Sequence, residues 1–251
     1  MISPSAPGQR HAALRTLALF VVLTALSACN VIPEAERYDV YQLPAASPEQ
    51  PHAATSLTVL RVGVAASGDL LASNRIITVH DQVRMSSYAG ARWASATPKL
   101  WQDHLVASLR RDGRLPHVAE EGDRVGVAHE LRTTLHAFHI EDPADGGTAR
   151  VAAEVRLIDV GNRHMIASQH FSAAQPLSTD SAETAARALG EATRTVTREI
   201  IDWSAEHLER TAAARAGSLT ETGRLGILSG FTGIAGVYAS PIPPRIATEQ
   251  E

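Results

Sequence analysis

Residues 149–159 read ARVAAEVRLID and contain the pattern that decides the fold. Apolar side chains such as Val151 and Leu157 point to one side of an extended chain. The charged Glu154 and Arg156 point to the other side. An alternation with a period of two residues is typical of a β-strand that has one face in a core and the other in water. The segment therefore predicts a sheet with one covered face.

Two further strands flank this one along the chain. Residues 125–140 precede it and residues 164–173 follow it, and both segments favour an extended backbone. The connection 141–148 is rich in Asp and Gly, and a Gly-Asn pair at 161–162 forms the other turn. Connections this short join antiparallel neighbours, so the three strands are expected to form a meander.

The N-terminal half predicts additional strands. Residues 57–65 alternate in the same way, and residues 75–79 and 83–89 flank a tight turn at 81–82, which indicates a hairpin. A small strand at 38–43 precedes a spacer rich in Pro, Ala and Ser.

A first helix is predicted for residues 97–113. Thr97-Pro98 is a typical helix start and Gly113 a typical stop. An apolar stripe with four-residue spacing follows Trp101, Leu105 and Leu109. This stripe is expected to lie on the sheet.

A second helix is predicted for residues 181–208, with Asp180 and Glu183 placed as in a capping box. Spacings of four and three residues connect a seam of side chains: Ala182, Ala186, Leu189, Thr193, Val196, Ile200, Trp203 and His207. We favour packing of this seam on the chain's own sheet, because its first residues are small. The alternative is pairing with a helix of a partner or of a second copy. The expected fold is therefore α+β, with an antiparallel or mixed sheet and two main helices packed on it, in one domain at 56–210.

Composition argues against several functions and sites. The 251 residues carry 23 Lys and Arg against 27 Asp and Glu, a formal net charge of -4, which argues against nucleic acid as a partner, because phosphate binding needs concentrated positive charge. A single cysteine, Cys29, excludes an intrachain disulfide and a Cys-rich zinc site.

That cysteine directly follows a predicted export signal. Arg10 and Arg15 precede an uncharged apolar stretch at 16–28, which fits a secretory signal better than a membrane span. The stretch closes with Leu-Ser-Ala-Cys at 26–29, a sequence that looks like the lipobox of bacterial lipoproteins. Residues 1–28 are thus expected to be removed, and Cys29 to carry a diacylglycerol and an N-acyl chain. A signal-anchor helix, or an ordinary signal peptide with an incidental cysteine, is the alternative.

The mature chain is expected at the periplasmic face of the outer membrane of a Gram-negative bacterium. Asn30 stands where an Asp would resemble an inner-membrane retention signal. Cleavage removes two positive charges and leaves a net charge of about -6, so membrane contact is expected through the acyl chains alone. Residues 29–55 are expected to form a tether, and the Gly- and Pro-rich residues 211–251 a flexible tail.

No catalytic residue and no metal ligand set is predicted. His129-Glu130 begins like a zinc-protease motif, but the second histidine is missing and the segment reads as a strand. On a regular strand His129 and His139 share one face and His136 lies on the other, so no common metal is expected.

Several residues in this order resemble one protein family. They are Arg75-Ile76, the segment YAGARWA at 88–94, the helix positions Pro98, Leu100, Leu105 and Leu109, the strands ending at Phe171, and the helix positions Ala188, Leu189, Ala192 and Trp203. With the lipobox, they resemble the ABC-type transport auxiliary lipoprotein family, which includes the PqiC-like periplasmic lipoproteins. The likeness covers most of residues 38–208.

The resemblance implies a non-catalytic part of an envelope system in which an inner-membrane ABC transporter and an MCE-type protein move lipids between membranes. It implies these proteins as partners and no cofactor besides the lipid on Cys29. Arg92, Trp93 and Tyr88 are candidates for the docking surface, because exposed Arg and aromatic side chains are common interface anchors. Alternatively, Trp93 fills the core and Arg92 pairs with an acid.

Two other functions share part of this evidence. A lipoprotein activator or scaffold of a cell-wall or envelope assembly machine would have the same export and anchoring signals. A periplasmic hydrolase would need a catalytic constellation that the sequence does not show.

Overall fold

The computed structural model describes residues 17–18, 37–44, 52–55, 58–143 and 146–230. The chain divides into an N-terminal unit, Met1–Tyr38, and a second unit, Asp39–Glu251. In the N-terminal unit the description covers a helical pair at 17–18 and residues 37–38. The predicted lipidation residue, Cys29, lies outside the described residues.

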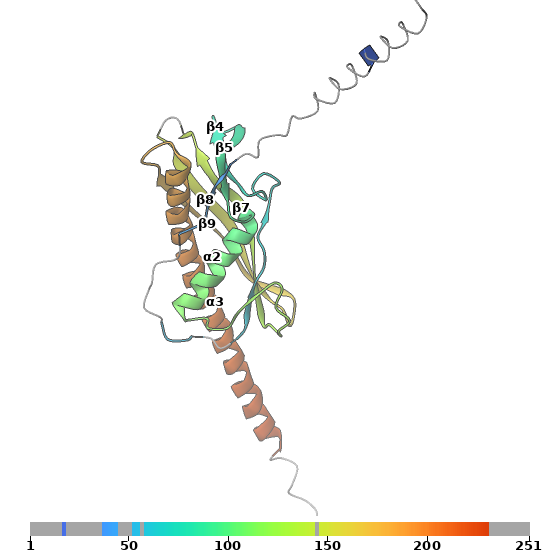
Figure 1. Cartoon of the computed structure of the whole chain (residues 1–251). Helices are drawn as coiled ribbons and strands as arrows, with labels where there is room; N and C mark the ends of the chain where they lie inside the picture. The colour runs from blue at the N-terminus through green and yellow to red at the C-terminus, as the bar shows by residue number, and fades with distance from the viewer. Residues whose placement is uncertain (1–16, 19–36, 45–51, 56–57, 144–145, 231–251) are drawn as a thin grey trace, which may run out of the picture. The chain divides into compact units, whose positions relative to one another are not determined.

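The second unit is built on a mixed sheet that has nine strands within the described residues (Figure 1). The elements, in chain order, are β1 (Asp39–Tyr41), β2 (Leu60–Val62), β3 (Ala66–Ser67), β4 (Arg75–His80), β5 (Arg84–Trp93), α2 (Thr97–Asp112), β6 (Val118–Glu120), β7 (His129–Glu141), β8 (Thr148–Asp159), β9 (His164–Pro176) and α3 (Ala182–Gly230). The expected α+β class, with a mixed sheet and two helices, is confirmed.

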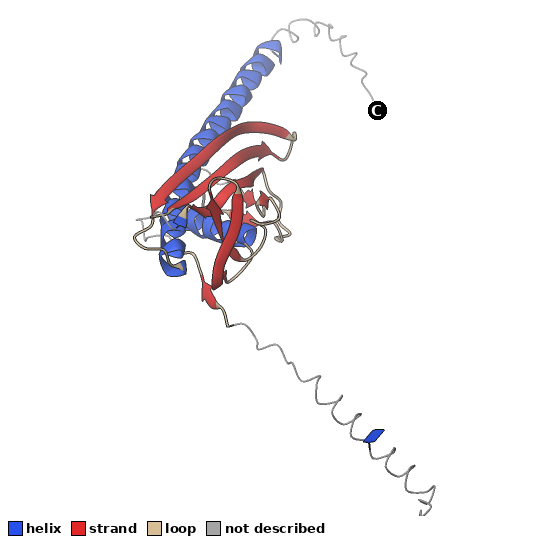
Figure 2. Cartoon of the chain, turned by 90° about the horizontal axis from the view of Figure 1, so that it is seen from above, coloured by secondary structure: helices blue, strands red, loops and turns tan. Residues whose placement is uncertain are grey.

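The predicted meander is present in β7, β8 and β9, which pair antiparallel in sequence order. Along β8, Val151, Val155 and Leu157 are fully buried, whereas Glu154 and Arg156 are partly exposed. Both helices contact the sheet, and α2 contacts α3 (Figure 2). The alternation in residues 149–159 thus predicted correctly which side chains face the core.

The other half of the sheet differs from a meander. β2, β3 and β4 all pair with β7, and each runs parallel to it. Parallel neighbours need long crossover connections, and α2 lies within the connection from the β4–β5 hairpin to β7. Local periodicity identifies strands but carries no information on such distant pairing.

The β4–β5 hairpin and α2 follow their local signals. Asp81 and Gln82 both have positive φ, as a tight primed hairpin turn requires. Gly113 ends α2 in the left-handed conformation at φ 86°, and its N–H donates to the Leu109 carbonyl. The helix start differs slightly, because Thr97 lies inside the first turn and its hydroxyl donates to the Ser73 carbonyl instead of capping the helix.

α3 packs its predicted seam against the chain's own sheet, as we expected. Leu189, Val196 and Ile200 are fully buried, and the helix contacts β8 and β9 most extensively. Its cap differs from the prediction, because Ser181 Oγ accepts the bond from the Thr184 N–H at 3.2 Å.

The domain extends beyond its predicted boundaries at both ends. β1 pairs in parallel with β5, so residues 39–41 belong to the sheet and not to the tether expected at 29–55. At the other end, α3 continues past the expected end at 208 as far as Gly230, into the region predicted as a tail. Residues 231–251 lie outside the described residues. Within the part of the chain that the structure describes, no helix is both long enough and apolar enough to span a bilayer.

Candidate functional site

Trp93, one of the predicted docking residues, lies in the core. It is 1% exposed, and its ring meets Phe138 of β7 edge to face, with ring centroids 5.9 Å apart. The side chain at the end of β5 therefore belongs to the hydrophobic core, and it is not available to a partner.

The other two predicted docking residues lie at the surface of β5. Arg92 is exposed and stands opposite Val40 of β1. Tyr88 is half-buried, and its hydroxyl donates a hydrogen bond to Asp180 Oδ1 at 2.8 Å. Burial and the Asp180 carboxylate both raise the Tyr88 pKa, so the phenol stays protonated. Tyr88 thus fastens β5 to the start of α3, which leaves Arg92 as the more accessible of the two.

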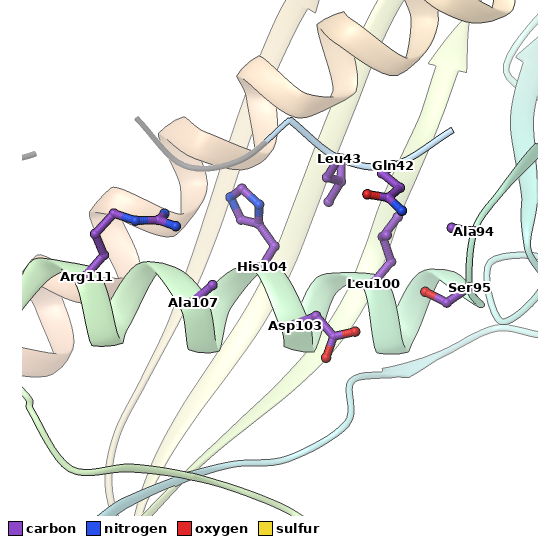
Figure 3. Close-up of a pocket in the computed structure, with 9 residues that line it drawn as sticks. All are labelled: Gln42, Leu43, Ala94, Ser95, Leu100, Asp103, His104, Ala107 and Arg111. Atoms are coloured by element: carbon purple, nitrogen blue, oxygen red, sulfur yellow. The ribbon is translucent and has the colours of Figure 1, made fainter. Parts of the chain in front are cut away.

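A groove of about 340 Å³ lies between α2 and the residues that follow β1 (Figure 3). Leu100, His104 and Arg111 rise from one face of α2 toward the segment that carries Gln42 and Leu43. Its walls combine aliphatic surface with a few polar groups, which is the usual composition of a binding site for a small molecule or a peptide.

His104 is the unusual residue of this groove. It is 8% exposed, and its Nε2 is buried without a hydrogen-bond partner among the described residues. Burial, and then the positive charges of Arg194 and Arg111, lower the His104 pKa from 6.5 to about 4. The imidazole is therefore neutral at pH 7 and offers an unused hydrogen-bonding atom beside two cations.

We expect the stability of the domain to fall in mild acid because of His104. Its pKa is depressed in the folded state, so its stabilising contribution is complete above pH 6.5 and is lost as the pH falls toward about 4. Between pH 7 and about pH 4.5, we expect His104 to lower the free energy of unfolding by about 2 kcal/mol. Urea unfolding at both pH values measures the loss.

His104→Leu is the matched variant for this measurement, because it keeps the side chain apolar at every pH. It is expected to show a smaller loss of stability in acid than the wild type. Burial also lowers the pKa of His129 and of His139, so part of the pH dependence should remain. An unchanged pH dependence in His104→Leu would contradict the assignment.

The sequence did not single out His104, since a histidine within an apolar helix face is usually structural. The available signal was its position four residues after Leu100, on the face of α2 that lines the groove with Gln42 and Leu43.

The prediction for the β7 histidines is wrong in part. A register shift between Leu135 and Ala137 makes His136 an extra residue in β7. This β-bulge reverses the alternation beyond it. His129 is buried at 2%, whereas His136 and His139 lie on the opposite, outer face of the sheet.

The mixed sheet and the two helices packed on it define the class of the fold, which is α+β. The chain belongs to the family described as the ABC-type transport auxiliary lipoprotein component, whose sequence profile matches residues 41–201. The family is named for an accessory role in transport by ABC systems, and no catalytic activity is part of that description.

Solved structures share the fold. Protein XCC0632 from Xanthomonas campestris superposes with a TM-score of 0.65 at 19% identity, over 70% of this chain and 99% of that one. A second crystal structure, of an uncharacterized protein, has a TM-score of 0.53 at 21% identity, over 66% of this chain and 98% of that one. No curated protein sequence matches the chain.

Proposed function

We propose that the chain is a non-catalytic lipoprotein that serves an ABC/MCE-type system for lipids or other hydrophobic solutes, linking the inner and outer membranes. The observation that carries the proposal is the family match over residues 41–201, which begins shortly after the lipobox-like sequence ending at Cys29. The MCE-type protein and the ABC transporter subunits are the proposed partners.

The anchor in this proposal is the lipid on Cys29, held in the outer membrane with the domain in the periplasm. Each buried methylene of an acyl chain contributes roughly 0.8 kcal/mol, so two or three chains fix a protein firmly. Asn30 in place of an Asp supports delivery to the outer membrane. The acyl chains are covalent, and we propose no other cofactor for this function.

Pairing of β1 with β5 makes the tether short. Asp39, the first residue of the sheet, follows Cys29 by ten residues. A fully extended chain of that length spans at most about 35 Å. The domain would therefore act close to the membrane, where a short tether raises the effective concentration of a weak docking site.

For the docking surface we propose the outer part of β5 around Arg92, which is exposed beside β1. Trp93 and Tyr88 contribute indirectly, since the first is buried and the second bonds to Asp180. The seam of α3 is covered by the chain's own sheet, so self-association would need another surface.

Affinity purification of the full-length lipoprotein from detergent-solubilised envelopes tests the proposal. We expect mass spectrometry to identify an MCE-domain protein and ABC transporter subunits, enriched over a control membrane lipoprotein with the same tag. Arg92→Glu should reduce their recovery, whereas Arg163→Glu, at the exposed β8–β9 turn, should not. Recovery of a peptidoglycan synthase instead would favour an activator of the cell-wall machinery.

A further inference from the structure

Three side chains of types that can ligate a metal converge from neighbouring strands on the outer face of the sheet. They are His136 of β7, Glu154 of β8 and His170 of β9, and one ligand atom from each lies within 4.8 Å of the other two. His136 Nε2 is 3.9 Å from Glu154 Oε2. The two imidazole rings stack at 20°, with centroids 4.8 Å apart. Two imidazoles and a carboxylate form a common ligand set for borderline divalent metals.

Strand register brings these residues together. Glu154 and His170 are direct partners in the β8–β9 ladder, and directly opposed side chains on one face are in contact distance. His136 is the extra residue of the β-bulge in β7, between Leu135 and Ala137. Regular alternation up to the bulge places His136 on the outer face, like Thr134, which is the ladder partner of Glu154.

The two carboxylate oxygens of Glu154 have different surroundings. Ser168 Oγ donates to Oε1 at 3.3 Å, and Arg156 Nε lies 3.9 Å from the same oxygen. Oε2 instead faces His136. A carboxylate that is held through one oxygen and free to ligate through the other is typical of metal sites, where hydrogen bonds from a surrounding layer orient the ligands.

We propose that His136, Glu154 and His170 bind one Zn²⁺ ion on the outer face of the sheet. A tetrahedral zinc ion with bonds of about 2.1 Å needs ligand atoms about 3.4 Å apart. The side chains of His136 and Glu154 are 44% and 36% exposed, so they have room to rotate and close this gap. Three protein ligands leave a fourth position for water, as in open zinc sites.

Within the described sheet β9 pairs with β8 alone, so a bound ion would connect this outer strand to β7 across β8. The metal would therefore stabilise β7, β8 and β9 from the outer face of the sheet, whereas α3 packs on their inner face. This inference does not depend on the transport partners, because it concerns the isolated protein and a metal ion. Its failure would leave the proposed function untouched.

Isothermal titration of the full-length lipoprotein in detergent tests the site, with metal removed beforehand and a purification tag that contains no histidine. We expect one Zn²⁺ per chain and no binding of Mg²⁺, which prefers all-oxygen sites. His136→Gln and His170→Gln should each weaken Zn²⁺ binding more than about a hundredfold, and Ser168→Ala about tenfold. His164→Gln, an exposed histidine of the same strand β9, should bind as the wild type does.

Thermal unfolding of the same proteins provides a second measurement. The metal-free variants should melt at the wild-type temperature, because the replaced side chains are exposed, and Zn²⁺ should raise the melting temperature of wild type and His164→Gln only. The proposal is overturned if wild type binds Zn²⁺ no better than Mg²⁺. It is also overturned if His136→Gln and His170→Gln bind like wild type, or if His164→Gln loses as much affinity as they do.

Discussion

Cys29→Ala is expected to lose all palmitate label and to disappear from the outer-membrane fraction, whereas the wild type is labelled and recovered there. The thiol is the proposed attachment point of the diacylglycerol, and alanine offers no atom for the bond. Without the acyl chains, the protein loses an anchor that contributes roughly 0.8 kcal/mol for each buried methylene. Metabolic labelling with palmitate, followed by membrane fractionation, measures both effects.

Ser27→Ala is the matched control for this experiment, because it keeps a small residue before the cysteine. It should be labelled and localised as the wild type is. A wild-type protein that carries no label, together with unchanged outer-membrane recovery of Cys29→Ala, would contradict lipidation at Cys29.

Trp203→Ala is expected to lower the free energy of unfolding by about 3 kcal/mol, the usual cost of truncating a large aromatic side chain in a core. Trp203 is 7% exposed, and its ring meets Phe171 of β9 edge to face, with centroids 5.7 Å apart. His207, one turn later in α3, packs on the same ring with centroids 4.9 Å apart. The smaller side chain leaves a cavity between α3 and the sheet.

Urea unfolding of the non-lipidated Cys29→Ala protein, with and without the tryptophan, measures this loss. Glu206→Ala is the matched control on α3, because Glu206 is exposed and its ion pair with Arg210 lies at the surface. Surface pairs of this kind contribute at most about 0.5 kcal/mol. A similar, small effect in Trp203→Ala would show that the seam of α3 is not held against the sheet.

Elements that depend on neighbouring residues could be predicted from the sequence. The alternation in 149–159 identified β8 and its buried face, and Gly113 marked the end of α2. The parallel pairing of β2, β3 and β4 with β7 could not be foreseen, because it joins segments far apart in the chain. The same holds for the pairing of β1 with β5, although the sequence does predict a small strand at 38–43.

The candidate sites depended even more on tertiary structure. One extra residue, His136, reverses the alternation of β7 beyond it, so strand periodicity alone places His139 on the wrong face. The burial of Trp93 and the groove at His104 both depend on how the sheet, α2 and the segment after β1 pack together. The sequence indicates the lipobox-like segment, which is one contiguous motif, and the family resemblance, which rests on the order of several short motifs along the chain.

Direct contact with the transport machinery is the central claim, and vesicle flotation with purified components measures it. Phospholipid vesicles that carry the full-length lipoprotein are mixed with the purified soluble domain of the MCE-type protein from the same envelope system and then floated on a density gradient. We expect the MCE domain to float with vesicles that carry the wild-type lipoprotein, less so with Arg92→Glu, and not at all with bare vesicles. An MCE domain that stays at the bottom of the gradient with every vesicle would contradict the proposed role.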